Sequence, residues 1–114
     1  MTDRELLEYA AKAAEIELIP MEVKNVTKRG DDRFIGYMTN PDQWQKGWFN
    51  PLTDDGDALR LAVKLRLDVE WLDHETVFVF SAQHVANKDP YATTRRAIVR
   101  AAAEMGKHKE KNNG

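Results

Sequence analysis

The hydrophobic period of the chain changes along its length, and this change limits the fold more than any other feature. Apolar residues recur at helical spacing over residues 58–65. The next apolar residues instead alternate with polar ones, as in a half-buried strand: Leu67, Val69 and Trp71. Antiparallel strands with helices packed against them define a layered α+β domain, which is the fold class we expect.

The same reading of the whole chain predicts three helices and two hairpins, in the order helix, hairpin, helix, hairpin, helix. The first helix is expected to begin at a capping box formed by Thr2 and Glu5, and the second at an N-cap on Thr53. The third is expected over residues 89–106, with Gly106 as its C-cap. The helices are expected to pack as a layer on the antiparallel strands.

Turn residues between apolar runs place the two hairpins at residues 21–40 and 67–80. The run 77–80 is apolar without alternation, which indicates a central strand covered on both faces. The second helix is expected to be largely buried, because Leu59 and Val63 widen its apolar face.

The length of 114 residues is that of one ordinary domain. We expect this single α+β domain over residues 1–106, followed by a disordered basic tail at residues 107–114. The net charge is −2, but it is unevenly spread. Residues 95–114 hold six basic and two acidic side chains, a balance of +4, so the remainder carries −6.

The absence of cysteine excludes disulfide scaffolds, thiolate zinc sites, iron–sulfur clusters and cysteine nucleophiles. No apolar run approaches the roughly 20 residues of a membrane span, and residues 1–4 do not lead into a signal peptide. The expectation is a soluble, cytoplasmic protein with no membrane partner.

Two stretches of the sequence resemble motifs of a known protein family. Residues 48–58 read Trp-Phe-Asn-Pro-Leu-Thr-Asp-Asp-Gly-Asp-Ala, and residues 94–102 read Thr-Arg-Arg-Ala-Ile-Val-Arg-Ala-Ala. Both are similar to the phage ABA sandwich domain family, whose second helix begins with Asn-Pro-x-Ser/Thr-Asp and whose closing helix has an Ala-Ile-x-Arg-Ala core. The resemblance covers about residues 1–105, although the Trp-Phe pair departs from the pattern and residues 21–45 match nothing in it. It implies a phage origin and a layered helix–sheet fold, and it brings no catalytic residue and no established reaction.

The main candidate site is an anion-binding or partner-binding surface at the start of the last helix: Thr94, Arg95, Arg96 and Arg100. Free N–H groups at a helix N-terminus favour negative charge, and guanidinium groups bind phosphate in a bidentate manner. The alternative is structural, with Arg96 and Arg100 paired to the acidic surface and Arg95 packed along apolar neighbours.

A secondary candidate lies in the loop at residues 40–51, and it consists of Trp44, Trp48 and Asn50. An aromatic binding lip is one interpretation of the two tryptophans. We favour the other, in which the tryptophans pin the loop over the core, because large aromatic side chains dominate core burial in small domains.

Two catalytic interpretations rank lower. Asp54, Asp55 and Asp57 invite a metal hypothesis, but capping and compensation of the helix dipole explain all three, so no metal ligand is assigned. Ser81 with His84 lacks the flanking glycines of a nucleophile elbow, and His74 and His84 are expected to be ordinary surface residues.

The functional hypothesis is a phage accessory protein that is not an enzyme, needs no cofactor, and binds a host protein in the host cytoplasm to modulate the host or its defences. The alternative is a phage protein that sequesters a small anionic ligand such as a nucleotide, and a metal-dependent hydrolase ranks third. Nucleic acid is disfavoured as a partner because most of the chain is acidic. A homodimer is the default oligomer.

Overall fold

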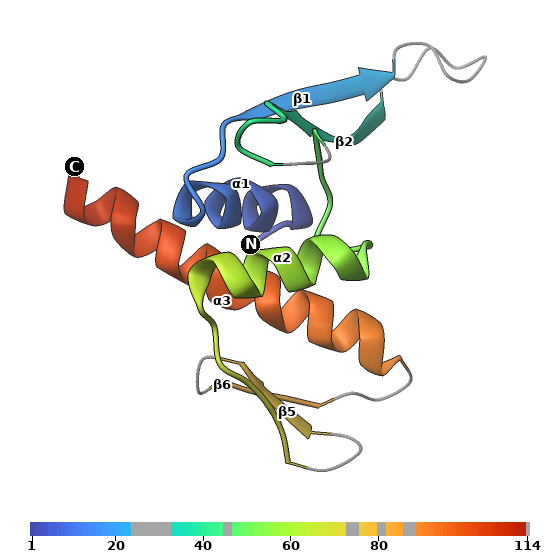
Figure 1. The fold of residues 1–114 in the computed structure, drawn as a ribbon, viewed down its shortest axis with the longest axis vertical. Helices are drawn as coiled ribbons and strands as arrows, with labels where there is room; N and C mark the ends of the chain where they lie inside the picture. Colours follow the sequence, from blue (N-terminus) through green and yellow to red (C-terminus); the bar gives the residue numbers. More distant parts are fainter. Residues whose placement is uncertain (24–32, 45–46, 73–75, 80–81, 86–88, 114) are drawn as a thin grey trace. The chain divides into compact units, whose positions relative to one another are not determined.

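The computed structural model describes residues 1–23, 33–44, 47–72, 76–79, 82–85 and 89–113. The chain forms an α+β fold in the expected order of helix, hairpin, helix, hairpin, helix (Figure 1). It divides into two compact units: Met1–Glu15 with Asn50–Gly114, and Ile16–Phe49. We call them unit 1 and unit 2. The single domain expected over residues 1–106 stays a prediction.

Unit 1 begins with helix α1 (Asp3–Ala13), and its capping box is as expected. The Thr2 hydroxyl accepts a hydrogen bond from the Glu5 backbone N–H at 3.1 Å, and the Glu5 carboxylate accepts one from the Thr2 backbone N–H at 3.2 Å. The hydrogen bonds that the Glu5 carboxylate accepts from the Thr2 backbone N–H and from the Thr2 hydroxyl lower the pKa of Glu5. The buried face of this helix is formed by Leu6, Leu7, Ala10 and Ala11.

Helix α2 (Asp55–Leu65) has a different N-cap from the predicted one. The cap is Asp54 rather than Thr53, and its carboxylate accepts a hydrogen bond from the Asp57 backbone N–H at 3.2 Å. The sequence is ambiguous here because Thr and Asp are both good caps and stand side by side. The expectation that Leu59 and Val63 widen the buried face is also wrong, since both side chains are mostly exposed.

Helix α3 (Pro90–Asn113) packs against α1, α2 and the sheet of unit 1, and its crossing with α1 is visible in Figure 1. Three consecutive residues are buried, which happens only when a helix is covered on several sides: Ala97, Ile98 and Val99. The predicted C-cap at Gly106 is wrong, because the helix continues to Asn113 and replaces the expected disordered tail. Gly106 instead lies against the backbone of α1, where its lack of a side chain permits the close approach.

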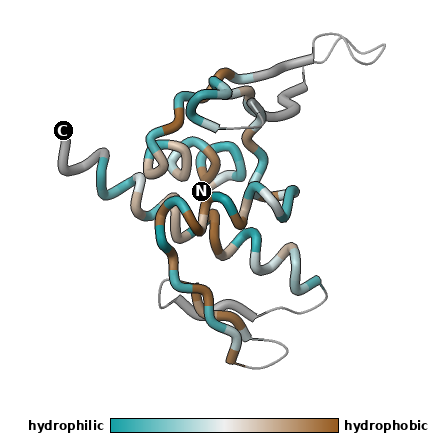
Figure 2. The backbone as a smooth tube through the Cα atoms, in the orientation of Figure 1, coloured by the Kyte–Doolittle hydropathy of each residue, from teal (hydrophilic) through white to brown (hydrophobic). Residues whose placement is uncertain are grey.

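The sheet of unit 1 has the order β4-β5-β6 and is antiparallel throughout: β4 (Val69–Trp71), β5 (Thr76–Val79) and β6 (Ala82–Val85). Strand β5 is central, as its continuous apolar run predicts, and Val77 and Val79 are fully buried. Strand β6 was not predicted, because its sequence Ala-Gln-His-Val has neither the continuous apolar run of β5 nor an alternation of apolar and polar residues. Hydrophobic residues, brown in Figure 2, recur along β4 and β5.

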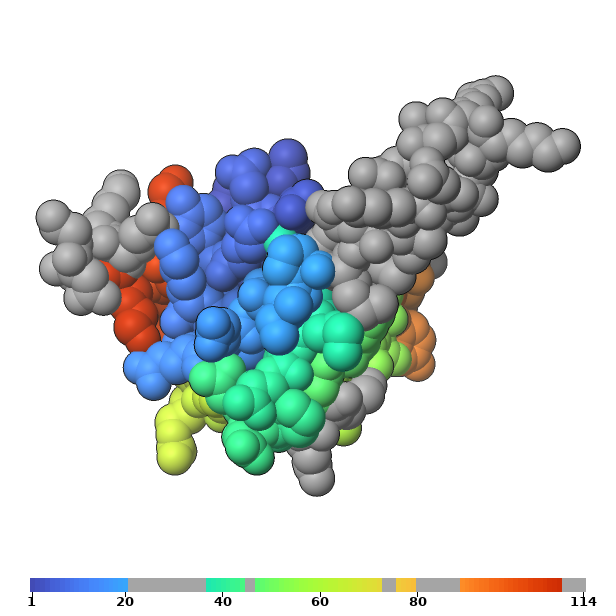
Figure 3. Space-filling model, turned by 90° about the horizontal axis from the view of Figure 1, so that it is seen from above, coloured from blue at the N-terminus to red at the C-terminus, as the bar shows by residue number. Residues whose placement is uncertain are grey.

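Unit 2 contains the other antiparallel sheet, in the order β1-β2-β3. The expected first hairpin is present as β1 (Leu18–Val23) and β2 (Arg33–Thr39), with an irregularity of register between Met21 and Glu22. The short strand β3 (Trp48–Phe49) pairs with β2 and was not predicted. Figure 3 shows the residues that follow β2, coloured green, packed as a continuous surface.

Candidate functional site

A pocket in unit 1 lies between α2, β4 and the first turns of α3, with a volume of about 540 Å³. We call it the α2–β4–α3 pocket. Its lining is mainly apolar and consists of Asp55, Ala58, Leu59, Ala62, Val69, Trp71, Pro90, Tyr91, Thr94, Arg95 and Ile98. Small-molecule sites in proteins commonly have volumes of about 300–1,000 Å³ and the same mainly apolar character.

Four large apolar side chains of this pocket remain open to solvent. Leu59 is 64% exposed and Tyr91 68%, while Trp71 and Val69 are 43% and 39% exposed. The floor is closed by residues that are nearly or fully buried: Ala58, Ala62 and Ile98. The pocket therefore combines a solid base with aliphatic and aromatic walls that no described part of the chain covers.

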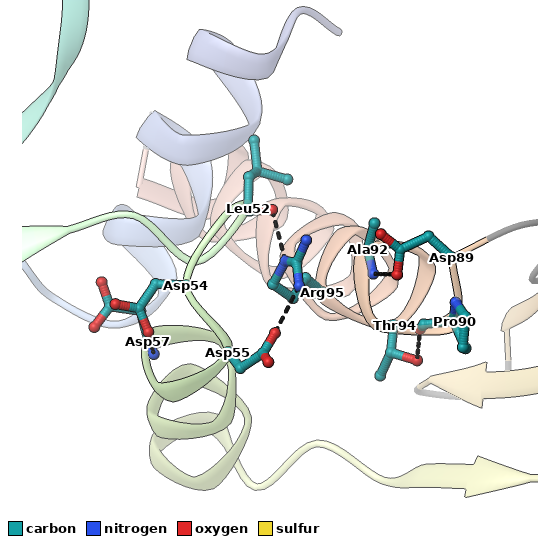
Figure 4. A network of polar contacts seen from close by, with 9 residues as sticks. All are labelled: Leu52, Asp54, Asp55, Asp57, Asp89, Pro90, Ala92, Thr94 and Arg95. Carbon is teal, nitrogen blue, oxygen red and sulfur yellow. Dashed lines mark hydrogen bonds and ion pairs between the residues drawn. The ribbon is translucent and has the colours of Figure 1, made fainter.

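One corner of the pocket is polar. There, Arg95 of α3 forms an ion pair with Asp55 of α2. The Arg95 Nη1 lies 2.6 Å from the Asp55 Oδ1, and the Arg95 Nε–H donates to the Leu52 carbonyl oxygen at 2.9 Å (Figure 4). The Arg95 side chain is only 18% exposed, whereas that of Asp55 is 64% exposed. Arg95 therefore joins α3 to the turn before α2, and an incoming anion would compete with Asp55 for its guanidinium group.

The N-terminus of α3 already holds a carboxylate of the chain itself. The Asp89 Oδ1 accepts a hydrogen bond from the Ala92 backbone N–H at 3.1 Å, and the Asp89 carbonyl oxygen accepts one from the Thr93 N–H at 3.0 Å. The Thr94 hydroxyl donates back to the Pro90 carbonyl oxygen at 2.7 Å (Figure 4). These contacts use part of the donor set that the predicted anion site needs.

The other two predicted residues, Arg96 and Arg100, do not line the pocket. The Arg96 Nη1 donates to the Asp3 Oδ1 of α1 at 2.9 Å, which is the structural alternative raised from the sequence. This hydrogen bond, together with the positive charges of Arg96 and Arg100, lowers the pKa of the Asp3 carboxyl. The structure thus brings Thr94 and Arg95 together in the pocket and leaves Arg96 and Arg100 beside α1.

Each of the three aspartates at the start of α2 contacts different groups of the chain itself. Asp54 caps the helix and Asp55 pairs with Arg95. Asp57 is fully buried; its carboxylate accepts from the Asn50 backbone N–H at 2.8 Å and from the Arg60 Nη1 at 3.1 Å. Within the described residues, no three His, Asp or Glu side chains are grouped in a way that could hold a metal ion.

The residues of the secondary candidate have mainly structural surroundings. Trp44 is buried in unit 2 and meets the Phe49 ring edge-on, with ring centroids 5.2 Å apart. This agrees with the core interpretation of Trp44, whereas Trp48 is half-buried in β3. Asn50 belongs to unit 1, where its carbonyl oxygen accepts from the Thr53 and Asp54 N–H groups and begins the turn into α2.

The remaining catalytic candidates are the serine and histidine residues near the second hairpin. His74 and Ser81 lie outside the described residues. His84 is in β6, where it pairs with Val77, but its side chain lies outside the described part of the chain.

Sequence reasoning missed the apolar walls of the pocket: Leu59, Val69, Trp71 and Tyr91. One signal for them was present. Helix α2 carries more apolar positions than one buried face needs, since Leu59 and Val63 follow each other at i, i+4 outside that face. An excess of this kind indicates a second apolar surface on the helix.

No protein-family model matches the chain, and no curated protein or solved structure matches it. Among the described residues, no helix has both the length and the apolar character needed to cross a membrane.

Proposed function

We propose that the chain acts by binding a partner protein through the α2–β4–α3 pocket. The observation that carries this proposal is the exposure of Leu59, Trp71 and Tyr91 around a solid apolar base. Soluble proteins rarely leave large apolar groups gathered on one surface unless a partner covers them. Trp and Tyr are also the residue types that most often dominate the binding energy of protein interfaces.

The composition of the pocket favours a protein over an anionic small molecule. Among the described residues that line it, the one cation is Arg95, which already contacts Asp55 and the Leu52 carbonyl oxygen. Binding a phosphate there requires displacing Asp55, whereas binding an apolar side chain requires only the release of water from Leu59 and Tyr91.

The resemblance to the phage ABA sandwich domain family makes a host protein in the host cytoplasm the partner that we propose. Phage genomes keep many small proteins that modulate host machinery, including defence systems. The support for this part is the motif at residues 48–58 and its counterpart at residues 94–102. The support for the pocket is independent of it.

Two substitutions on α2 form a matched pair for testing the pocket. Leu59 lines it and Val63 does not, yet both are exposed to nearly the same extent, 64% and 68%. A tagged chain is used to capture its partner from host cells, and the affinity of that partner is then measured for Leu59→Glu and Val63→Glu. We expect Leu59→Glu to cost about 2 kcal/mol or more of binding free energy, roughly a thirtyfold loss of affinity, with Val63→Glu near wild type. Equal affinities for the two variants would contradict the proposal.

A second candidate function is the binding of a small ligand, which the volume of about 540 Å³ supports. A thermal-shift screen of nucleotides and of uncharged aromatic compounds tests it, since a ligand at a hundred times its Kd stabilises the folded state by about 2.7 kcal/mol. Stabilisation by an aromatic compound that Leu59→Glu removes would favour this candidate over a protein partner.

A further inference from the structure

The hairpin formed by β4 and β5 determines which backbone groups of β4 face outward. Leu72 lies opposite Thr76, and the Leu72 N–H donates to the Thr76 carbonyl oxygen at 2.9 Å. In an antiparallel ladder, hydrogen-bonded pairs alternate with non-hydrogen-bonded pairs. Glu70 therefore bonds with its opposite residue in β5, and the N–H and C=O groups of Val69 and Trp71 point to the other edge of β4.

That edge of β4 is open within the described part of the chain. The strand order of the sheet is β4-β5-β6, so β4 is an edge strand, and all three of its residues are exposed. An edge strand presents its outward N–H and C=O groups as a template for another strand.

The same two residues that direct their backbone outward also line the α2–β4–α3 pocket. Side chains alternate between the faces of a strand, so Val69 and Trp71 share the face toward the pocket, and Glu70 lies on the opposite face. A strand added beside β4 would place every second side chain against the pocket and the others beside Glu70.

We propose that β4 binds an extended segment of the partner protein as an additional antiparallel strand, with apolar side chains on the pocket face alternating with basic ones on the Glu70 face. The inference rests on the proposed function and specifies how the partner is held. Main-chain hydrogen bonds to Val69 and Trp71 supply affinity in this mode, and the pocket supplies selectivity for the alternate side chains.

The charges around this edge favour a basic segment. Asp68 and Glu70 are exposed on β4 or beside it, whereas the charges of Asp55 and Arg95 at the pocket pair with each other. The lining cation, Arg95, is held by Asp55 and Leu52. Lysine or arginine residues that alternate with apolar residues would complement this acidic surface.

A second copy of the chain is a poorer occupant for the same reason. An antiparallel pairing of β4 with β4 of another copy that sets Val69 opposite Trp71, and so pairs the outward residues of both strands, places Glu70 opposite Glu70 of that copy. Like charges directly opposite each other destabilise a strand pair. The charges therefore select a different chain as the partner.

The test uses two isomeric peptide probes with the sequence Lys-Val-Lys-Val-Lys-Val-Lys, one methylated on the valine amides and the other on the lysine amides. With valines facing the pocket in an antiparallel pair, the valine N–H groups point toward β4 and the lysine N–H groups point away. We expect the lysine-methylated peptide to bind the full chain and to slow hydrogen exchange at the Val69 and Trp71 amides. We expect the valine-methylated peptide to bind at least about tenfold more weakly.

A pair of protein variants tests the same edge from the other side. Val69→Pro removes an outward N–H without removing a bond between β4 and β5, and Val69→Ala removes a similar amount of apolar surface but keeps the N–H. Val69→Pro is expected to bind the lysine-methylated peptide at least about tenfold more weakly than Val69→Ala. If Val69→Pro does not fold, the peptide pair still decides the question on the unaltered chain.

Equal binding of the two peptides, or binding of neither, would overturn strand addition, as would a dimer in sedimentation that Val69→Pro dissociates. These outcomes are separable from failure of the proposed function. If Leu59→Glu loses the partner but the two peptides bind equally, the pocket remains the binding site and strand addition is refuted. If Leu59→Glu still binds the partner, the proposed function of the pocket is refuted.

Discussion

Replacement of Gly106 by alanine tests the close contact between α1 and α3 in unit 1. An added Cβ at Gly106 would overlap the Tyr9 carbonyl oxygen, and it would lie 2.7 Å from the Tyr9 carbonyl carbon and 3.2 Å from the Ala13 nitrogen. These are backbone atoms, so no side-chain rotation relieves the overlap. Helices α1 and α3 must instead move apart, by on the order of 1 Å, which forfeits packing of the buried alanines along the crossing.

The expected sign follows from two opposed effects. Alanine is the better helix former by about 1 kcal/mol, while overpacking a tight contact costs about 2–3 kcal/mol. We therefore expect Gly106→Ala to lower the free energy of unfolding by about 1–2 kcal/mol, measured from the urea midpoint by circular dichroism.

The control for this prediction is Gly56→Ala on α2. The nearest atoms to an added Cβ there are side-chain atoms of Arg60 and Asp54, at 3.1 and 3.2 Å. Because Arg60 can move, we expect a change within about 0.5 kcal/mol. A Gly106→Ala protein as stable as wild type, or more stable, would refute the contact and restore the interpretation of Gly106 as a helix end.

Three further predictions follow from named contacts. Asp54→Ala should destabilise the chain by about 1 kcal/mol in urea unfolding and Thr53→Ala by less than about 0.5 kcal/mol; the reverse order would return the N-cap to Thr53. Arg96 lowers the pKa of Asp3 in the folded state, so the contribution of Asp3 to stability is complete above its unfolded pKa and is lost as the pH falls through its lower folded pKa. The urea midpoint should consequently fall less in Asp3→Asn than in wild type between pH 6 and pH 3, and equal falls would argue against the pair. The double variant Arg96→Glu with Arg100→Glu should remain folded, since exposed ion pairs contribute about 0–1 kcal/mol, and should still bind the partner; loss of binding would move the site to the predicted basic surface.

The parts of the fold that were predictable depend on neighbouring residues. The capping box of Thr2 and Glu5 spans four residues, and the apolar run that marks β5 as central is continuous in the sequence. Strand β3 has only two residues, and β6 has neither the continuous apolar run of β5 nor an apolar alternation, so only their partner strands define them. Gly106 resembles a helix end until the backbone of Tyr9, nearly a hundred positions earlier, is placed beside it.

The candidate site was likewise predictable only where its residues are neighbours in the sequence. The sequence identified Thr94 and Arg95 because charged and hydroxyl residues at a helix start are a local pattern. It did not identify the partners of the arginines, since Asp55 lies 40 positions from Arg95 and Asp3 lies 93 positions from Arg96. The pocket depends on where α2, β4 and α3 meet, so its exposed walls could not be distinguished from core residues by hydrophobicity alone.

The most direct test of the central claim is methyl NMR of the chain during titration with the captured partner. The account predicts chemical-shift changes at the pocket methyl groups of Leu59, Ala62, Val69 and Ile98, with the methyl groups of Val63 nearly unchanged. Changes that leave these pocket methyl groups unaffected, and appear instead around Arg96 and Arg100 or in the loop with Trp44 and Trp48, would contradict it.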